Sequence, residues 1–217
     1  MTPMSYVAER RIEEKERRRA EILDAAERLY AGKGWDAVTM EEVARSARLS
    51  RALLYVYFRD KEELLFGIGE RAMAVLRERF VAAVARQARG LDQVEAIGRA
   101  YIAYASEFPH YFDACARFQA HSVAIEPGSN EGACAVSGDA VMAVVVGAIE
   151  TGLKDGTIRR DVGNPLLLGI SLWAFTHGTI QLAMAKDHEL ARLGIAVTAL
   201  TEYVLDFIRR ALQLSAG

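Results

Sequence analysis

Residues 49–65, LSRALLYVYFRDKEELL, contain the side chains whose types and spacing are best suited to chemistry. Ser50 can cap a short helix that presents Arg51, Tyr55 and Tyr57 outward. A guanidinium and two phenol hydroxyls on one short helix can donate hydrogen bonds to polar edges and anionic groups inside a groove. The chemistry that this stretch indicates is recognition by hydrogen bonding.

The charge distribution makes this stretch basic within a chain that is almost neutral. The net charge is −2, and residues 1–65 contain 13 Lys and Arg against 13 Asp and Glu. From Arg45 to Lys61, however, five basic residues are opposed only by Asp60, which gives a local charge of +4. A small basic patch on a neutral body favours sequence-selective binding to a nucleic-acid duplex over bulk attraction to polyanions.

Composition places the chain among globular proteins that bury a core. Hydrophobic residues make up 52% and charged residues 26% of its 217 residues. Cys115 and Cys134 show no C-x-x-C spacing, so neither a disulfide framework nor a zinc ribbon is expected. The charged N-terminus lacks the apolar segment of a signal peptide. The longest apolar run, residues 140–149, is shorter than the ~18 residues of a membrane span, so we expect a cytoplasmic protein without membrane association.

The basic stretch requires a small helical unit to position it. We expect a mixed-charge arm over residues 1–15, frayed or helical only near its end, and a first helix over residues 16–32. Thr39 and Glu42 form a capping box that opens a short second helix. A turn over residues 47–50 then leads to the helix that carries Arg51. A long helix followed by two short helices joined by a tight turn is a three-helix helix-turn-helix.

The rest of the chain is also predicted to be helical, with a loop-like stretch over residues 126–136. The fold class is therefore all-α, with about nine helices in two parts, an N-terminal helix-turn-helix over residues 16–66 and a larger helical domain over residues 67–217. The further helices are expected at residues 61–89, 91–108, 110–125, 137–155, 164–186 and 194–212.

The last two helices have more apolar surface than one chain can easily cover. Residues 164–186 are apolar on most sides, which implies burial all round. Residues 194–212 carry apolar side chains at alternating three- and four-residue steps, as in a coiled coil. A two-fold, four-helix homodimer interface would cover both. Its predicted residues are Leu172, Phe175, Leu200, Val204 and Phe207.

Histidines and aromatic residues of the larger domain suggest a pocket rather than a reaction centre. No carboxylate or cysteine lies at ligand spacing from the four histidines, and no activated nucleophile or glycine-rich phosphate loop is present. We therefore predict no metal, no cofactor and no catalytic residue. Large apolar side chains with a few polar tips suit a small-molecule site, although the same residues could simply pack the core. The candidate ligand-binding residues are Tyr104, Phe108, Phe118, His121, Trp173 and His177.

Several motifs resemble the tetracycline-repressor (TetR) family of bacterial regulators. The strong part covers residues 16–66, with ILDAAERLY, WDAVT, LSRALLYVYF and DKEELL in family order and spacing. The weaker part is GLKDGTIR at residues 152–159 and LWAFTHG at residues 172–178. The resemblance implies a homodimeric regulator that binds a double-stranded DNA operator and a small effector. In that arrangement Arg51 reads a base or anchors a phosphate, Tyr55, Tyr57 and Lys61 contact the backbone, and Thr39 is a helix cap first and a phosphate contact second.

The chain departs from the family at residues that would read bases. The family often has Gly or Pro and then a hydroxyl residue at positions 52 and 53, where this chain has Ala52 and Leu53. An apolar side chain there could contact a thymine methyl group instead. Glu41 stands where some members carry a base-contacting Arg. The operator sequence of a relative is therefore not expected to transfer.

These observations favour a ligand-responsive transcriptional regulator, most simply a repressor that an apolar or amphipathic effector releases from a near-palindromic operator. Two alternatives from other classes remain open. One is a helical enzyme that uses His121 or His177. The other is a protein-interaction module whose helix-turn-helix no longer reads DNA.

Overall fold

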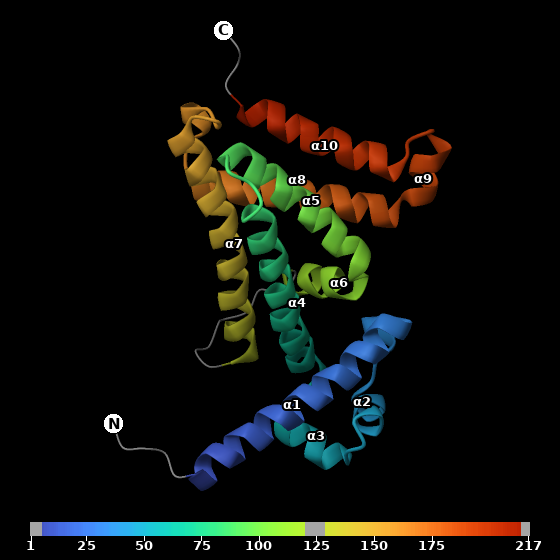
Figure 1. The fold of residues 1–217 in the computed structure, drawn as a ribbon. Coiled ribbons are helices and arrows are strands. Elements are labelled where there is room, and N and C mark those ends of the chain that lie inside the picture. Colours follow the sequence, from blue (N-terminus) through green and yellow to red (C-terminus); the bar gives the residue numbers. More distant parts are fainter. Residues whose placement is uncertain (1–5, 120–128, 214–217) are drawn as a thin grey trace. The chain divides into compact units, whose positions relative to one another are not determined.

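The computed structural model describes residues 6–119 and 129–213. These residues contain ten α-helices, two short 3-10 helices and no strand, which confirms the all-α prediction (Figure 1). The count exceeds the expected nine because Asp187–Arg192 forms a short helix, α9, where we expected only a connector.

The chain divides into two compact units that are each discontinuous in sequence. The N-terminal unit comprises Met1–Ala72 and Pro109–Cys134, and the C-terminal unit comprises Met73–Phe108 and Ala135–Gly217. Two helices, α4 (Lys61–Val84) and α7 (Asn130–Asp155), contribute residues to both units. The domains predicted from the sequence are each continuous, whereas these two units are not. The predicted domain boundary at residues 66–67 stays a prediction.

The N-terminal unit is a three-helix motif with a fourth helix packed on it. It contains the first part of α4, up to Ala72, in addition to the elements that follow. These are α1 (Tyr6–Lys33), the 3-10 turn Trp35–Ala37, α2 (Met40–Ser46), α3 (Arg51–Tyr57) and α6 (Pro109–Gln119). A continuous core joins these elements, and most of its members are less than 5% exposed. The members of this core are Ile22, Leu23, Ala26, Tyr30, Trp35, Val38, Val43, Ala44, Leu54, Phe58, Leu64, Leu65, Ile68 and Ala114.

Local sequence signals explain where the short helices begin. The Thr39 hydroxyl accepts a hydrogen bond from the Glu42 backbone N–H at 3.3 Å, and the Glu42 carboxylate accepts one from the Thr39 N–H at 3.0 Å. This reciprocal pair is the predicted capping box. In the following turn Arg48 adopts a left-handed backbone with φ of 57°. The chain thereby reverses direction between α2 and α3, and Ser50 caps α3.

Three helix boundaries differ from the prediction by five residues or more. Helix α1 begins at Tyr6 instead of residue 16, so most of the expected arm is helical. Helix α7 begins at Asn130, inside the expected loop, where the Ser129 hydroxyl accepts a hydrogen bond from the Gly132 N–H at 3.0 Å. Helix α4 ends at Val84 rather than at residue 89. Residues 120–125 of the predicted sixth helix and residues 126–128 of the predicted loop lie outside the described residues.

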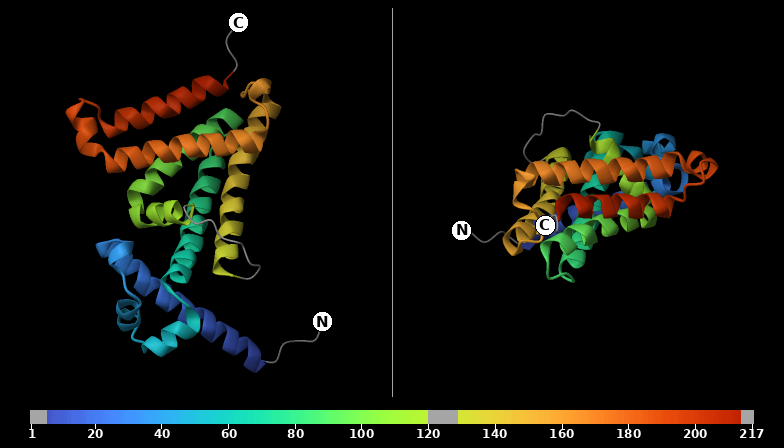
Figure 2. Two further views of the ribbon diagram at one scale, coloured as in Figure 1. Left: turned by 180° about the vertical axis from the view of Figure 1, so that it is seen from behind. Right: turned by 90° about the horizontal axis from the view of Figure 1, so that it is seen from above.

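The C-terminal unit is built on α5, α8 and α10, which lie side by side (Figure 2). Their bounds are Gly90–Glu107, Pro165–Ala185 and Val197–Leu212, and a 3-10 turn at Arg160–Val162 precedes α8. Polar caps fix the junction between α5 and the end of α7. The Asp155 carboxylate accepts from the Gly90 N–H at 2.8 Å, and the Thr157 hydroxyl accepts from the Leu91 N–H at 3.0 Å.

The GLKDGTIR motif therefore has a structural role at this junction. A Cβ atom at Gly90 would lie 1.9 Å from the backbone nitrogen of Gly152, so the two backbones meet where no side chain fits. A Cβ atom at Gly152 would collide with the buried side chain of Ile158 at 2.5 Å. Glycine at both positions is required by close packing rather than by a ligand.

Two helices are long and apolar enough to cross a membrane by length and composition alone, α7 and α8. Uninterrupted apolar runs in the sequence do not reveal them, because polar residues divide each helix into shorter apolar runs. In α8, 21 residues from Pro165 to Ala185 contain no charged side chain. About a third of the most apolar stretch of each helix is buried inside the structure. Core helices of folded domains can have the same length and apolar composition.

Candidate nucleic-acid interface

Helix α3 presents an exposed face while its inner face anchors it in the core. The Ser50 hydroxyl accepts a hydrogen bond from the Leu53 N–H at 3.2 Å, and Leu54 and Phe58 are fully buried. The outward residues of the helix are exposed, with Tyr55 at 43% and Val56 at 74%. The exposed set as a whole is Arg51, Ala52, Leu53, Tyr55 and Val56. A seven-residue helix held by its buried side is thus free to place its outer face in a groove.

Unpaired cations lie at and just before this face. Arg45, Arg48 and Arg51 are exposed and form no hydrogen bond or ion pair through their side chains with any described residue. In contrast, the Arg59 guanidinium is paired with Asp60 at 3.1 Å. Guanidinium groups without an internal partner retain all their donors for an external anion.

Two predicted contact residues are partly engaged inside the N-terminal unit. Tyr57 is half-buried and packs against the core. The Lys61 ammonium donates to the backbone carbonyl of Asp36 at 3.3 Å and lies 5.0 Å from the centre of the Trp35 ring. Burial lowers the pKa of Lys61, and the Asp36 carboxylate opposes that shift. Lys61 could reach a phosphate only from this anchored position at the start of α4.

Thr39 serves as a cap, as predicted. Its hydroxyl also donates to the Glu42 carboxylate at 2.8 Å. The Lys33 ammonium lies 2.6 Å from the same carboxylate, and this pairing, with the Thr39 hydrogen bonds, lowers the pKa of Glu42 to about 2. Glu42 therefore stays ionised, and the hydroxyl of Thr39 is occupied within the cap.

Helix α6 is attached to the three-helix motif by a polar network that we did not predict. The Arg117 guanidinium donates to both carboxylate oxygens of Asp36, at 2.9 and 3.0 Å, and to Asp113 at 2.8 Å. The Tyr30 hydroxyl donates to Asp113 at 2.6 Å. Burial and the hydrogen bond to Asp113 raise the pKa of Tyr30, so this hydroxyl stays protonated. The spacing of Asp113 and Arg117, one helical turn apart, was the only signal in the sequence.

Four of the six candidate ligand residues gather in the C-terminal unit. The Tyr101 hydroxyl and His177 Nδ1 lie 2.7 Å apart, and the Trp173 and His177 rings are 6.0 Å apart. The Tyr101 and Tyr104 rings stack at 6.4 Å, and Phe108 lies 5.7 Å from Tyr104. Burial lowers the pKa of His177, which favours the neutral ring. We call Tyr101, Tyr104, Phe108, Trp173 and His177 the aromatic cluster.

The remaining candidate ligand residues do not belong to this cluster. Phe118 lies in the N-terminal unit, where its ring meets Phe66 at 5.6 Å, and His121 lies outside the described residues. Tyr101 was missed, although its spacing to Tyr104 and Phe108 along one helix could have revealed it. Among the described residues no group of three or more His, Cys, Asp or Glu is arranged to hold a metal ion.

Apolar side chains remain exposed on α8 and α10. Phe175 and Phe207 are 44% and 52% exposed, and their rings are 5.8 Å apart. Leu172 and Leu200 are half-buried, but Val204 is 5% exposed and packs inside its own unit. Val204 belongs to the buried stripe of α10, whereas Phe207 lies on its exposed side, and the interface itself stays a prediction. The buried residues of α10 are Thr201, Val204, Leu205, Ile208 and Leu212. Helix α8 is likewise not buried all round within one chain, since Leu166, Leu167, Ile170, Leu182 and Met184 are also exposed.

Two protein-family models match the chain. Residues 22–68 match the model described as bacterial regulatory proteins of the tetR family. Residues 94–208 match the model described as the tetracyclin repressor-like C-terminal domain, which alone spans more than half of the chain.

Curated relatives share shorter segments. The regulator BetI of Rhizobium meliloti (strain 1021) is 40% identical over 82 residues, 38% of this chain and 40% of BetI. HbdR of Aromatoleum sp. (strain CIB) is 41% identical over 51 residues, 24% of this chain and 22% of HbdR. The matched segment therefore spans less than half the length of these relatives.

Solved structures share the fold over almost the whole chain. A Rhodococcus sp. RHA1 protein of unknown function has a TM-score of 0.73 at 21% identity, covering 91% of this chain and 95% of its own. A transcriptional regulator of Saccharomonospora viridis in complex with choline reaches 0.71 at 19% identity, covering 90% and 97%. FadR of Bacillus subtilis in complex with stearoyl-CoA reaches 0.68 at 16% identity, covering 86% and 95%.

Proposed function

Because this chain belongs to the TetR family of bacterial regulatory proteins, we propose that it is a ligand-responsive transcriptional repressor. In this proposal it binds a near-palindromic operator, and a small apolar or amphipathic effector releases it. The observation that carries the proposal is the outer face of α3, where Arg51 is exposed and without an internal partner among the described residues, beside exposed Tyr55.

The proposed reader is α3, placed in the major groove. Arg51 stands at the first position of the helix, where it can donate two hydrogen bonds to a guanine edge or one to a phosphate. Ala52 can contact a thymine methyl group, and Tyr55 can donate to the backbone. Arg45 and Arg48 add positive charge for phosphates. Tyr57, Lys61 and Thr39 are secondary contacts because their side chains are partly engaged internally.

A homodimer would present two such readers. The exposed apolar faces of α8 and α10 support this arrangement, because a second copy could cover Phe175 and Phe207 together with the neighbouring leucines. Two readers related by a two-fold axis would meet half-sites about 34–36 Å apart, or somewhat more. The protein would act in the cytoplasm, where its operator is.

The aromatic cluster is the proposed contact surface for the effector. Its side chains offer apolar area with a neutral histidine and phenol hydroxyls as polar tips. The neighbour FadR, in complex with stearoyl-CoA, supports a small molecule with an apolar or amphipathic body. The Saccharomonospora viridis regulator, in complex with choline, supports a small organic ligand, and the cationic head of choline would suit aromatic rings. An effector that binds the non-operator conformation better by about 1–3 kcal/mol would be sufficient for release.

Selection of bound duplexes from a random DNA pool tests the function directly. Wild type should enrich a near-palindromic site, and Arg51→Ala should lose the enriched sequence. Arg192→Ala, which removes an exposed cation from α9, is the matched control and should bind like wild type. If wild type enriches no sequence, the protein-interaction alternative is favoured, and turnover that survives Arg51→Ala would favour the enzyme alternative.

A second experiment tests the effector. Acyl chains, choline esters and steroids are screened for a raised melting temperature, and each hit is then added to the protein–operator complex. A true effector should release the operator, and Trp173→Ala should weaken its binding without weakening operator binding. A compound that raises the melting temperature but leaves the complex intact is not an effector.

A further inference from the structure

We propose that the N-terminal half of α1 is a second DNA-binding surface, which binds backbone phosphates of the duplex flanking the half-site that α3 reads. This inference rests on the proposed function, because it assumes that α3 engages DNA. The surface lies outside the matched helix-turn-helix model, which begins at residue 22. Helix α1 begins at Tyr6, so about four turns of helix precede the matched segment.

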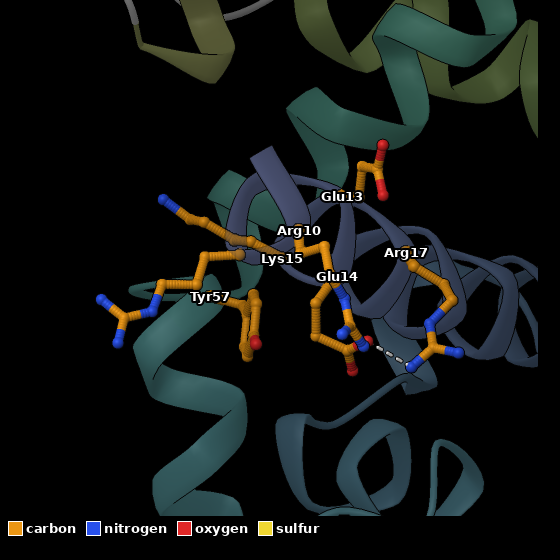
Figure 3. Close-up of a pocket in the computed structure, with 7 residues that line it drawn as sticks. Arg10, Glu13, Glu14, Lys15, Arg17 and Tyr57 are labelled. Atoms are coloured by element: carbon orange, nitrogen blue, oxygen red, sulfur yellow. Dashed lines mark hydrogen bonds and ion pairs between the residues drawn. The ribbon is translucent and has the colours of Figure 1, made fainter. Parts of the chain in front are cut away.

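A concave surface joins this part of α1 to the end of the reader helix (Figure 3). Six of its residues come from α1, and the seventh, Tyr57, is the last residue of α3. In Figure 3 Tyr57 lies beside Glu14, with Lys15 and Arg17 extending to either side. The lining residues are Arg10, Arg11, Glu13, Glu14, Lys15, Arg17 and Tyr57. A nucleic-acid strand that passes the end of α3 would therefore meet α1 next.

The charge of this surface suits a polyanion. Four cations and two carboxylates line it, which leaves a net charge of +2. Glu14 is engaged internally, since the Arg17 guanidinium donates to it and lowers its pKa. Arg11 and Lys15 are exposed, and neither makes a side-chain hydrogen bond or ion pair with any described residue.

The two unpaired cations are spaced to act together. Arg11 and Lys15 are four residues apart, so their Cβ atoms lie about 5–6 Å apart on the same side of the helix. Being on a helix, they are already held at this spacing before binding, and the entropic cost of ordering them is smaller than for a disordered basic tail. Phosphate contacts of this kind position a protein on DNA without reading its sequence.

The test uses full-length protein with Arg11→Ala and Lys15→Ala combined, which we call the arm variant, on the operator obtained by selection. Two duplexes are compared, one ending at the half-site edges and one carrying about one further helical turn of 10–10.5 base pairs on each side. Affinity is measured against salt concentration. Arg86→Ala with Arg192→Ala removes the same charge from exposed positions of the C-terminal unit and serves as the control.

Wild type and the control should bind the longer duplex more tightly than the short one, whatever the flanking sequence. The arm variant should bind both duplexes equally, and its slope of log K against log salt should be smaller by about 0.9 for each phosphate that it no longer neutralises. If the arm variant keeps the wild-type slope and the wild-type preference for the longer duplex, the N-terminal half of α1 does not bind phosphates and this inference is wrong. Absence of binding by wild type on either duplex would instead contradict the proposed function.

Discussion

At the scale of single residues, the exposed arginine at the start of α3 differs in role from the many arginines that are paired within the fold. Arg71, Arg99 and Arg209 each bind two carboxylates and hold helices together. Arg51 makes no such contact among the described residues. Its planar set of donors is therefore available for bidentate recognition, which a lysine cannot reproduce.

Arg51→Lys should separate base reading from phosphate anchoring. The substitution keeps the charge but removes the bidentate geometry, so discrimination against the wrong base at one operator position should fall by about 1–3 kcal/mol. The salt dependence of binding should stay the same, because the number of neutralised phosphates does not change. Competition binding with single-base operator variants measures both quantities. Unchanged discrimination at every position would show that Arg51 contacts only the backbone.

The two buried cysteines define a second residue-scale prediction. Burial, with a smaller effect of nearby Cys115, raises the pKa of Cys134 to about 12, and both side chains are at most 2% exposed. At pH 8 the thiolate fraction of Cys134 is then on the order of one in ten thousand, whereas an unfolded cysteine has a pKa of about 8.5. Since thiolates are the reactive species, a thiol-specific reagent should label the folded chain slowly and both cysteines rapidly in denaturant. An exposed thiol from Ala82→Cys should react rapidly in the folded chain, and rapid labelling of wild type would contradict the prediction.

At the scale of elements, the attachment of α6 to α1 is the least predictable part of the N-terminal unit. Helix α6 is distant in sequence from the three-helix motif, yet Asp113 and Arg117 bind Tyr30 and Asp36 there. A change in the position of α6 would therefore act on the C-terminal end of α1 and on the 3-10 turn before α2. Through this attachment, a shift of α6 can change the position of the reader helix α3 within the N-terminal unit.

Tyr30→Phe should weaken this attachment. The variant keeps the ring in the core but removes the hydroxyl that donates to the Asp113 carboxylate at 2.6 Å. The free energy of unfolding should fall by about 1–2 kcal/mol, as for a partly buried hydrogen bond to a charged group. Tyr203→Phe is the control, because Tyr203 is 64% exposed. Urea denaturation compares the two, and equal stability of both variants would mean that the hydrogen bond contributes nothing.

Elements whose signals are local could be predicted from the sequence, while those that depend on distant partners could not. The caps at Thr39 and Ser50 were correct because cap residues act on backbone groups two or three positions away. The start of α1 was misplaced because a mixed-charge segment has no apolar face, although ion pairs such as Arg17–Glu14 support the helix. The network around Arg117 was missed because nothing in the sequence shows that α6 returns to α1.

The candidate site residues also divide into those that local sequence signals predict and those whose position depends on distant parts of the chain. The exposed face of α3 follows from the capped, seven-residue helix and its buried Leu54. In contrast, Val204 was assigned to an exposed seam because both stripes of α10 are apolar, and periodicity does not show which one faces the chain's own core. Phe118 was grouped with Trp173 by chemistry alone, and the two belong to different compact units.

At the scale of the whole molecule, the exposed apolar side chains of α8 and α10 predict the oligomeric state. Phe175→Glu combined with Phe207→Glu places two charges where a partner would pack, so the variant should be monomeric by light scattering. Val81→Glu, a similar change at a 46% exposed position of α4, should leave the wild-type mass unchanged. The monomeric variant should also lose most of its affinity for a two-half-site operator, because one reader then binds alone. A dimeric mass for the double variant would exclude this face as the interface.

The discontinuity of the N-terminal unit limits how the reader can be transplanted into another regulator. Its core includes Ala114 of α6, and its polar network ends on Arg117, yet these residues come after α5 in the chain. A chimera with a single crossover near residue 72 would join this reader to a foreign sixth helix and leave Tyr30 and Asp36 without these α6 partners. A working chimera therefore needs three crossovers, after residues 72, 108 and 134, so that residues 109–134 are transferred together with residues 1–72. Modular engineering of this regulator should treat those two segments as one exchangeable part.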